Sequence, residues 1–389
     1  MRSGLPIFTV FFLHAVAFAN WLPRIPAVKE ALQLTDAELG YCLMGASLGT
    51  FIVLPVSNYL IQITGLNRSI LILSIIFFAT IPAAGFAGSG PALFGVLFFV
   101  GACVAGLEVA INTKADDMER ASGRRVMTTC HGFWSLGTVV GAFIGSIFAG
   151  LDISTGVHLL TVAPFLIFAA TVAVHHLPVS EPSQLSREHT KKFYLPGPSL
   201  FGLCIIAFSA LAIEGSIMDW SAVYLSDVLN ASAFEAGLGF AAFATTMTVG
   251  RMSGDWLRGH FNSQILLRFC GGFAVLGLAI AFSFSHSAVV LFGFAVAGLG
   301  ISIAYPLVIV AAAGRSDRPA AVNVASLSMI SFLAFLACPP LIGIVSEWAG
   351  LRNALLGLIP FALVIFVLAG QVRPVEAPTE GRVQPLPPA

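Results

Sequence analysis

Long apolar segments separated by short polar connections run through the whole chain. A transmembrane helix needs about 20 consecutive apolar residues, and twelve segments approach or exceed that length. The pattern predicts an all-α integral membrane protein with twelve transmembrane helices in two pseudo-symmetric six-helix bundles. We expect these helices at about 5–22 (with an extension to residue 31 as an alternative), 37–62, 69–87, 91–114, 126–150, 156–177, 198–226, 233–257, 263–284, 288–312, 318–346 and 352–370.

The longest polar connection lies near the middle of the chain and separates two sets of six apolar segments. We therefore predict a six-helix bundle over residues 1–177, a cytoplasmic linker over 178–197 and a second six-helix bundle over 198–370. Residues 371–389 are rich in proline and are predicted to form a disordered cytoplasmic tail.

Two short segments of the chain echo each other. V-A-G-L-E-V-A-I at 104–111 and V-A-G-L-G-I-S-I at 296–303 are 192 residues apart, about half the length of the chain. The echo indicates a duplicated transporter whose fourth and tenth helices are counterparts, with substrate bound between the halves near the membrane midplane. Where the first copy has Glu108 the second has Gly300. We expect the first half to carry the proton at Glu108, and we expect Gly300, which has no side chain, to leave room opposite Glu108.

The distribution of basic residues predicts the orientation. If the chain starts inside and crosses at each predicted helix, 16 of its 19 Lys and Arg residues fall on the inner side, in connections or near the inner ends of helices, Arg251 among them. Only Arg24, Lys29 and Arg352 fall outside. Because cytoplasmic connections are enriched in Lys and Arg, both termini are predicted to be cytoplasmic, in a bacterial-type inner membrane.

Composition supports a lipid environment and excludes other classes. The chain is 57% hydrophobic and 10% charged, with a mean hydropathy of +0.92, too apolar for a soluble domain. Basic and acidic residues balance at 19 each, which gives no reason to expect nucleic acid as a partner. The six cysteines lie in or beside apolar segments without C-x-x-C spacing. We therefore expect neither a disulfide framework nor a metal site.

The first apolar segment has one alternative interpretation. Arg2, an apolar stretch and the sequence A-F-A at 17–19 imitate a secretory signal peptide with its cleavage site. The apolar segment continues past that point through Trp21, and the rest of the chain crosses the membrane many times. We favour a retained first helix.

Three segments resemble the major facilitator superfamily, and within it the fucose-permease-like branch of proton-coupled sugar transporters. They are F-F-L-H-A-V-A at 11–17, I-P-A-V-K-E-A-L at 25–32 and L-E-V-A-I-N at 107–112. The last is similar to the L-E-T-A-A-N segment of that branch, whose glutamate takes part in proton coupling. The resemblance implies a major facilitator fold, proton symport, and a coupling role for Glu108.

The chain also departs from that branch. The aspartate of its first helix falls on Leu22, and Gln62 stands where the superfamily's signature between helices 2 and 3 has an aspartate. After helix 8, the segment G-R-M-S-G-D at 250–255 keeps Arg251 and Asp255 of the equivalent signature. These departures put fucose in doubt as the substrate and leave the fold expectation intact.

Ionisable residues within a membrane span cost roughly 2.5–3.5 kcal/mol each on insertion scales, so they normally face a cavity or a partner. Glu108 and His131 flank the turn between the fourth and fifth helices and are predicted to lie at the same depth. Asn112 shares the face of Glu108, and Trp134 continues the face of His131. The pair is either a proton site, for which a carboxyl and an imidazole are suited, or a static link between two helices.

The seventh helix carries Glu214 near its middle and Asp219 toward its outer end. Shifting Glu214 back by 192 residues gives Leu22, so Glu214 is a candidate substitute for the missing helix 1 carboxylate in proton coupling. Asp219 is a candidate substrate-binding residue. Its alternative role is a cap or ion pair near the outer rim.

Three further residues are candidates for substrate binding. Arg24 presents a planar fork of donors that suits an anionic or hydroxyl-rich solute, and its alternative is to reach the outer lipid headgroups. Trp134 offers an aromatic face for a sugar ring. Asn323 is the 192-residue counterpart of His131 and a candidate polar group of the cavity.

The residues favour a secondary transporter of a small polar solute, with a sugar-like solute as one candidate, driven by proton symport. The alternative within transport is proton-coupled efflux of drugs or metabolites by antiport. We find no H-E-x-x-H, G-x-S-x-G or Walker-type motif, so we expect neither an enzyme nor a cofactor. The expected partners are the solute, protons and the lipid bilayer, and the protein is expected to be a monomer.

Overall fold

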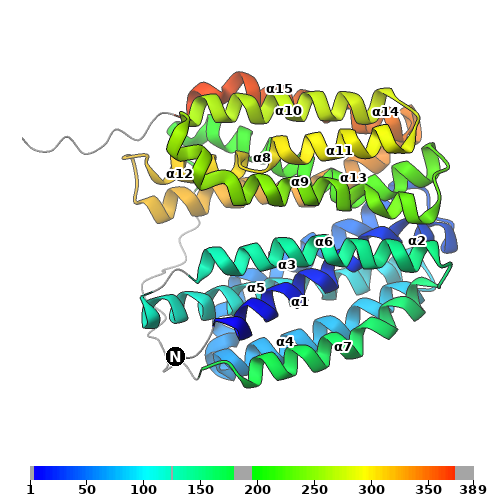
Figure 1. Cartoon of the computed structure of the whole chain (residues 1–389), viewed down its shortest axis with the longest axis horizontal. Helices are drawn as coiled ribbons and strands as arrows, with labels where there is room; N and C mark the ends of the chain where they lie inside the picture. The colour runs from blue at the N-terminus through cyan, green and yellow to red at the C-terminus, as the bar shows by residue number, and fades with distance from the viewer. Residues whose placement is uncertain (1–3, 124–125, 179–194, 373–389) are drawn as a thin grey trace, which may run out of the picture.

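The structure, a computed structural model, describes residues 4–123, 126–178 and 195–372, and in these ranges it is almost entirely helical. The helices form two halves that lie side by side with their axes roughly parallel (Figure 1). The first half contains α1 (Leu5–Trp21), η1 (Leu22–Arg24), α2 (Ile25–Ala31), α3 (Asp36–Thr64), α4 (Leu66–Thr80), η2 (Ile81–Phe86), α5 (Gly90–Ser122), α6 (Met127–Gly150) and α7 (Thr155–His175).

The second half contains η3 (Pro198–Leu200), α8 (Phe201–Val223), η4 (Tyr224–Val228), α9 (Ala233–His260), α10 (Ser263–Ser283), α11 (Ser287–Ile301), α12 (Ala304–Ala313), α13 (Ala320–Ala349), α14 (Leu351–Leu356), α15 (Ile359–Val367) and η5 (Leu368–Gln371). Within the described ranges, eleven helical stretches are long and apolar enough to span a membrane. The twelfth span is α9, which is 28 residues long and less apolar. The predicted all-α membrane fold is confirmed.

We name the two ends of the molecule by the predicted orientation. The inner end is where α1 begins, α7 ends and α8 begins, on the left in Figure 1, and the outer end is opposite. At the outer end, α3 and α9 begin with the same device. Thr35 and Ser232 each accept a hydrogen bond from the backbone of a glutamate three residues later, whose side chain accepts from theirs in return. This capping box fixes the first turn of both helices.

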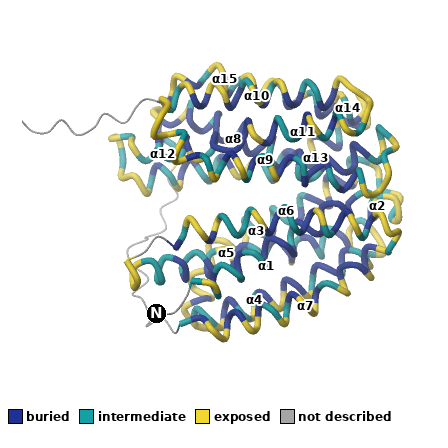
Figure 2. The backbone as a smooth tube through the Cα atoms, in the orientation of Figure 1, coloured by how far each residue is buried: buried dark blue, intermediate teal, exposed yellow. Residues whose placement is uncertain are grey.

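The core of each half is built on close helix packing. In the first half α1 packs against α6, and α3 packs against α5. A Cβ added at Gly137 or Gly141 of α6 would lie 2.4 Å from a backbone oxygen of α1, so glycine is what lets these two backbones approach. Burial extends along most of α1 and α8 (Figure 2).

Two equivalent hydrogen bonds reveal the true register between the halves. Thr50 of α3 donates to the Gly101 carbonyl of α5 at 3.0 Å, and Thr246 of α9 donates to the Ala295 carbonyl of α11 at 2.6 Å. The two acceptors are 194 residues apart and the two donors 196, so neither helix pair keeps the 192-residue offset of the sequence echo. On the offset of the acceptors, which lie on the same spans as Glu108 and Gly300, the counterpart of Glu108 is Ser302.

The expectation that Gly300 leaves room opposite Glu108 is wrong. A Cβ at Gly300 would lie 2.5 Å from the Ala274 nitrogen of α10, and one at Gly106 would lie 3.1 Å from Leu73 of α4. Both glycines therefore face the third span of their own half. Gly300 is a packing residue with no access to the space between the halves.

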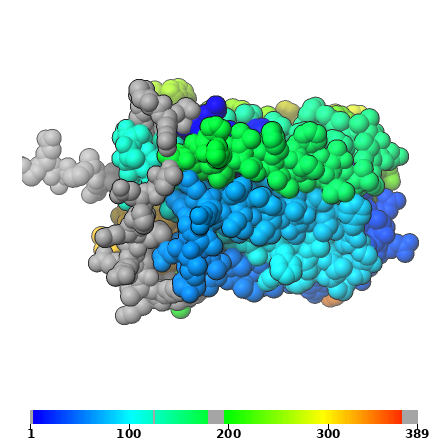
Figure 3. Space-filling view, turned by 90° about the horizontal axis from the view of Figure 1, so that it is seen from below, coloured from blue at the N-terminus to red at the C-terminus, as the bar shows by residue number. Residues whose placement is uncertain are grey.

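The surface facing away from the partner half is apolar. Figure 3 shows this face of the first half, where α4 and α7 run side by side over its length. Phe165 and Phe168 of α7 are each 72% exposed. Large exposed apolar side chains over a whole face are costly in water and favourable against lipid, which is consistent with a multi-pass membrane protein.

Candidate functional site

The two halves meet along α3 with α13 and α6 with α9, and their closest contacts lie toward the outer end. A Cβ at Gly40 would be 2.4 Å from the Pro339 oxygen, and one at Gly237 would be 2.5 Å from the Ser146 hydroxyl. The Ser47 hydroxyl donates to the Phe335 carbonyl at 2.8 Å. The outer part of the interface is therefore packed backbone against backbone.

Lys29 of α2 closes the outer rim. Its Nζ lies 2.5 Å from Asp36 of the same half and 2.6 Å from Asp227 of the other half. Asp36 also accepts a hydrogen bond from Ser346 of α13, and the Ala37 backbone donates to Glu347 at 3.2 Å. We call this group of residues the outer lock, because each of its interactions either crosses between the halves or anchors Asp36.

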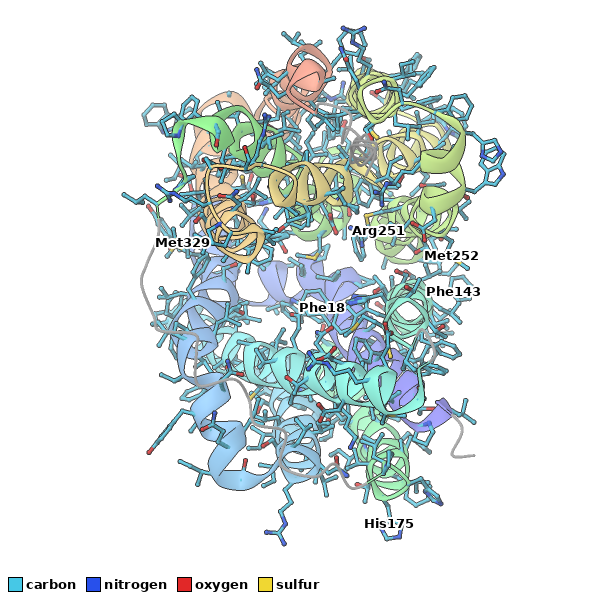
Figure 4. All side chains as sticks on the ribbon, turned by 90° about the vertical axis from the view of Figure 1, so that its left-hand side faces the viewer. Phe18, Phe143, His175, Arg251, Met252 and Met329 are labelled. Carbon is cyan, nitrogen blue, oxygen red and sulfur yellow. The ribbon has the colours of Figure 1, made fainter. Side chains whose placement is uncertain are left out.

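The inner part of the interface is open. Among the described residues, the hydrogen bonds and ion pairs between the halves all lie near the outer end. They join α2 and the outer part of α3, from the first half, to η4 and α13, from the second. Figure 4 looks at the inner end with all described side chains drawn, and open space remains between the halves. Arg251 of α9 and Phe18 of α1 lie on opposite sides of it. The molecule is thus closed at the end named outer and open at the end named inner.

An ion pair lines this opening on the second half. Nη2 of Arg251 lies 3.0 Å from both carboxylate oxygens of Glu214 on α8. The Arg251 side chain is 33% exposed and that of Glu214 is 17% exposed. Mutual neutralisation explains how two full charges are tolerated inside the span.

A break in the tenth span holds the arginine in place. Residues 302–303 separate α11 from α12. Pro306 has no N–H, so it cannot donate the helical hydrogen bond to the Ser302 carbonyl. That carbonyl instead accepts from Nε of Arg251 at 3.4 Å. A Cβ at Gly250 would lie 2.2 Å from the Ser302 hydroxyl, so glycine before Arg251 allows α9 this close to the break.

On the first half, His131 is exposed on the opening. Its face of α6 lies between the face that meets α1, marked by Gly137, and the face that meets α9, marked by Ser146. The ring packs edge-on against Phe11 at 5.6 Å between ring centres.

The expected contact between Glu108 and His131 is not present in this structure. No hydrogen bond joins the two side chains among the described residues, and α5 and α6 share few contacts. The reason is packing, because α5 packs against α3 and α6 packs against α1, and these contacts keep α5 and α6 apart. α5 and α6 are therefore consecutive along the chain but make little contact in the bundle.

Glu108 is exposed on α5. It is seven residues from Gly101, so the two share a helix face, and a Cβ at Gly101 would meet the Ala46 oxygen of α3 at 1.8 Å. Glu108 thus lies on the side of α5 toward the interface helix α3. Within the described part of the chain, its carboxylate has no hydrogen bond or ion pair, and Asn112 donates only to the Glu108 backbone at 2.8 Å.

Asp219 and Trp134 lie partly buried at the edges of the site. Asp219 is four residues from Gly215, which faces Phe335 of α13, so Asp219 lies on the side of α8 toward α13. Trp134 packs edge-on against His14 at 4.7 Å between ring centres. Within the described residues, no group of three or more His, Cys, Asp or Glu side chains is arranged to hold a metal ion.

Comparison with known proteins agrees with this architecture. The Major Facilitator Superfamily profile matches residues 7–326. The chain belongs to this superfamily. An uncharacterized MFS-type transporter of Yersinia pestis is 31% identical over 373 residues, which cover 94% of each protein.

Two solved superfamily structures share the fold. A bacterial homologue of the human lysosomal transporter Spinster, in an inward-facing conformation, has a TM-score of 0.75 and 15% identity over 95% of this chain and 96% of that one. The E. coli fucose:proton symporter FucP has a TM-score of 0.62 and 18% identity over 95% and 98%. The resemblance to the superfamily is confirmed, and FucP shares its fold. Members of this superfamily carry small solutes.

Two predicted substrate-binding residues of this superfamily member lie away from the opening. Arg24 is buried in the first half, where its guanidinium donates to Thr155 at 3.3 Å and to the Ile153 carbonyl at 2.5 Å. Asn323 is buried where the connection before α13 folds back, and it donates to Asp317 at 3.2 Å. These placements favour structural roles for both side chains.

The sequence interpretation missed Arg251. The predicted helix over 233–257 already contains Arg251, but the residue was counted only with the basic residues of the inner side and was not paired with Glu214. The structure places it within α9, which continues to His260. The available signal was length, since a helix beginning at Ala233 needs about 20 residues to cross the bilayer core and this one still contains Arg251 at its nineteenth position.

Proposed function

We propose that this chain is a proton-coupled symporter that moves a small polar solute through the opening between its halves by alternating access. The supporting observation is the placement of four ionisable side chains around that opening. Glu214 and Arg251 come from the second half, and Glu108 and His131 come from the first. Ionisable groups inside a membrane protein mark solute and proton pathways.

The closed outer end and open inner end fit one of the two states that such a cycle requires. In the other state the outer lock opens and the inner ends of the halves approach. Lys29 is suited to hold the present state, because it joins Asp36 and Asp227 across the interface. The alternation would carry solute and proton together across the membrane to the same side.

Glu108 is the best candidate for the coupling proton. It faces the interface without a side-chain partner in the described structure, so nothing but a proton or the solute neutralises it there. A carboxyl in low dielectric changes its protonation when its surroundings change from open to closed. His131 and Glu214 are the further candidates, since both can exchange protons within reach of the same opening.

The test uses purified protein in liposomes loaded with a pH-sensitive dye. A panel of sugars, sugar acids and amphipathic drugs is first screened for thermal stabilisation, and each binder is then added outside. Symport predicts that the lumen acidifies as the solute enters. Alkalinisation of the lumen indicates antiport, the alternative mode, and solute movement without any proton movement contradicts coupling altogether.

A further inference from the structure

Arg251 presents unused donors to the opening. Its Nε donates to the Ser302 carbonyl and its Nη2 to Glu214. Its Nη1 has no partner among the described residues and is not one of the buried unpartnered atoms, so it is open to solvent. A guanidinium held rigidly on one edge and free on the other is arranged to receive a ligand.

The ligand chemistry follows from what already binds there. Glu214 places both carboxylate oxygens 3.0 Å from a single nitrogen of Arg251. This pairing leaves the two-nitrogen edge, which matches a carboxylate in parallel, unfilled. A carboxylate on the solute would therefore make a better-matched pair than Glu214 does.

We propose that the solute of this transporter is a small organic anion whose carboxylate binds Arg251 in exchange for Glu214. The inference rests on the proposed transport function and adds the substrate class. When the solute carboxylate takes the guanidinium edge, the hydrogen bonds from Nη2 to Glu214 break. Glu214 is then left without its ion-pair partner, because the solute carboxylate neutralises Arg251, and it takes a proton from the aqueous opening. When the solute leaves, that proton leaves and the ion pair re-forms.

The opposite wall sets the order of binding. Phe18 of α1 lies across the opening from Arg251 (Figure 4). The first half also carries Glu108, on the side of α5 that faces α3. An ionised Glu108 repels an anion, so protonation of Glu108 precedes solute binding. An ammonium-bearing solute would instead bind the unpaired Glu108. The structure favours the anion because Arg251 is the side chain with preoriented, unused donors.

The closing experiment measures binding alone, with sodium acetate as a minimal carboxylate and with acetamide and sodium chloride as matched controls. In the Glu214→Gln variant, which lacks the competing carboxylate, acetate should raise the melting temperature of the purified protein by about 2 °C or more. Acetamide and chloride should not. The double variant Glu214→Gln/Arg251→Gln, which removes the pair without leaving a lone charge, should lose the response. Arg258→Gln, on the same helix, should leave it unchanged in the Glu214→Gln background.

Several results would overturn the proposal. They are an equal response to acetate and acetamide, an acetate response that survives in the double variant, the absence of any acetate response, and a response only to methylammonium chloride. This assay requires no proton gradient. A failure here therefore rejects the anion site while leaving proton-coupled transport to the dye assay.

Discussion

Nη2 of Arg251 on α9 lies 3.0 Å from both oxygens of the Glu214 carboxylate on α8, although the two residues are 37 positions apart in the sequence. The pair stands on the wall of the opening between the halves. It holds a positive and a negative charge inside a membrane span, and it leaves part of the guanidinium free.

The pair should show strong non-additivity in stability. Glu214→Gln leaves the Arg251 charge unpaired, and for a partly buried site we expect a loss of roughly 1–3 kcal/mol. Adding Arg251→Gln removes the lone charge and should restore most of that loss. Thermal unfolding of the two single variants and the double variant in detergent measures the coupling. Additive losses would contradict the ion pair.

Gly40 should control opening of the outer end. A Cβ at this position would lie 2.4 Å from the Pro339 oxygen of the other half, a collision that exists only while the outer end is closed. Gly40→Ala should therefore favour the outer-open state. Ser47→Cys reports it through faster labelling by an impermeant maleimide from outside, over a low background because the six native cysteines are buried.

Two substitutions serve as controls for Gly40→Ala. Gly101→Ala introduces a collision within the first half, 1.8 Å from the Ala46 oxygen, and should lower stability without raising the labelling rate. Gly95→Ala meets no atom within 4 Å and should change neither. If Gly40→Ala labels no faster than Gly95→Ala, the glycine contact does not control the outer end.

Asp227→Asn should loosen the outer lock from the other half. It removes the attraction between Asp227 and Lys29, which are 2.6 Å apart, while Lys29 keeps Asp36. An exposed pair contributes about 0.2–1 kcal/mol, so we expect up to about a fivefold gain in outside labelling of Ser47→Cys. Asp255→Asn, at the inner end, is the matched control. Equal labelling in the two variants would show that the Asp227–Lys29 pair does not stabilise the closed outer end.

The connection before α13 should lose a restraint in acid. The Ser199 hydroxyl donates to Asp317 at 2.5 Å and Asn323 donates at 3.2 Å, and the Ser199 bond is the main cause of the lowered pKa of Asp317. A lowered pKa means that the stabilisation is present above the ordinary value of about 3.9 and is lost as the pH falls through the lower folded value.

Hydrogen exchange of residues 315–323, corrected for its intrinsic pH dependence, provides the measurement. Exchange in the wild type should rise below about pH 4 toward that of Asp317→Asn, which should be the faster of the two at pH 6. If the two proteins exchange alike at pH 6, the carboxylate does not restrain this connection. Asn323→Ala should affect the same segment and leave solute affinity unchanged, as its buried structural position implies.

The sequence was sufficient to predict the twelve spans and the duplication, because a bilayer core imposes one length on every helix and a duplicated bundle retains local sequence similarity. It was insufficient for the register between the halves. The echo aligns Glu108 with Gly300, while the contacts of Thr50 and Thr246 align it with Ser302. A shift of two residues rotates a helix position by about 200°, which moves a residue from cavity to core.

The site was predicted only in part. Glu108, His131 and Glu214 could be recognised because each is an ionisable residue in an apolar segment. Their partners could not, because Glu214 meets Arg251 through the packing of α8 on α9, and Glu108 is separated from His131 by the packing of α1 and α3. Side-chain partners across helices depend on rotation about each helix axis, and apolar segments without strong periodicity do not specify it.

The most direct test of proton coupling through Glu108 is solute accumulation by the Glu108→Gln variant in liposomes under an imposed proton gradient. The control is Asp116→Asn, two turns further along α5. Glu108→Gln should lose gradient-driven accumulation and retain exchange of labelled for unlabelled solute, while the control accumulates like the wild type. Undiminished, pH-independent accumulation by Glu108→Gln would contradict the proposed coupling.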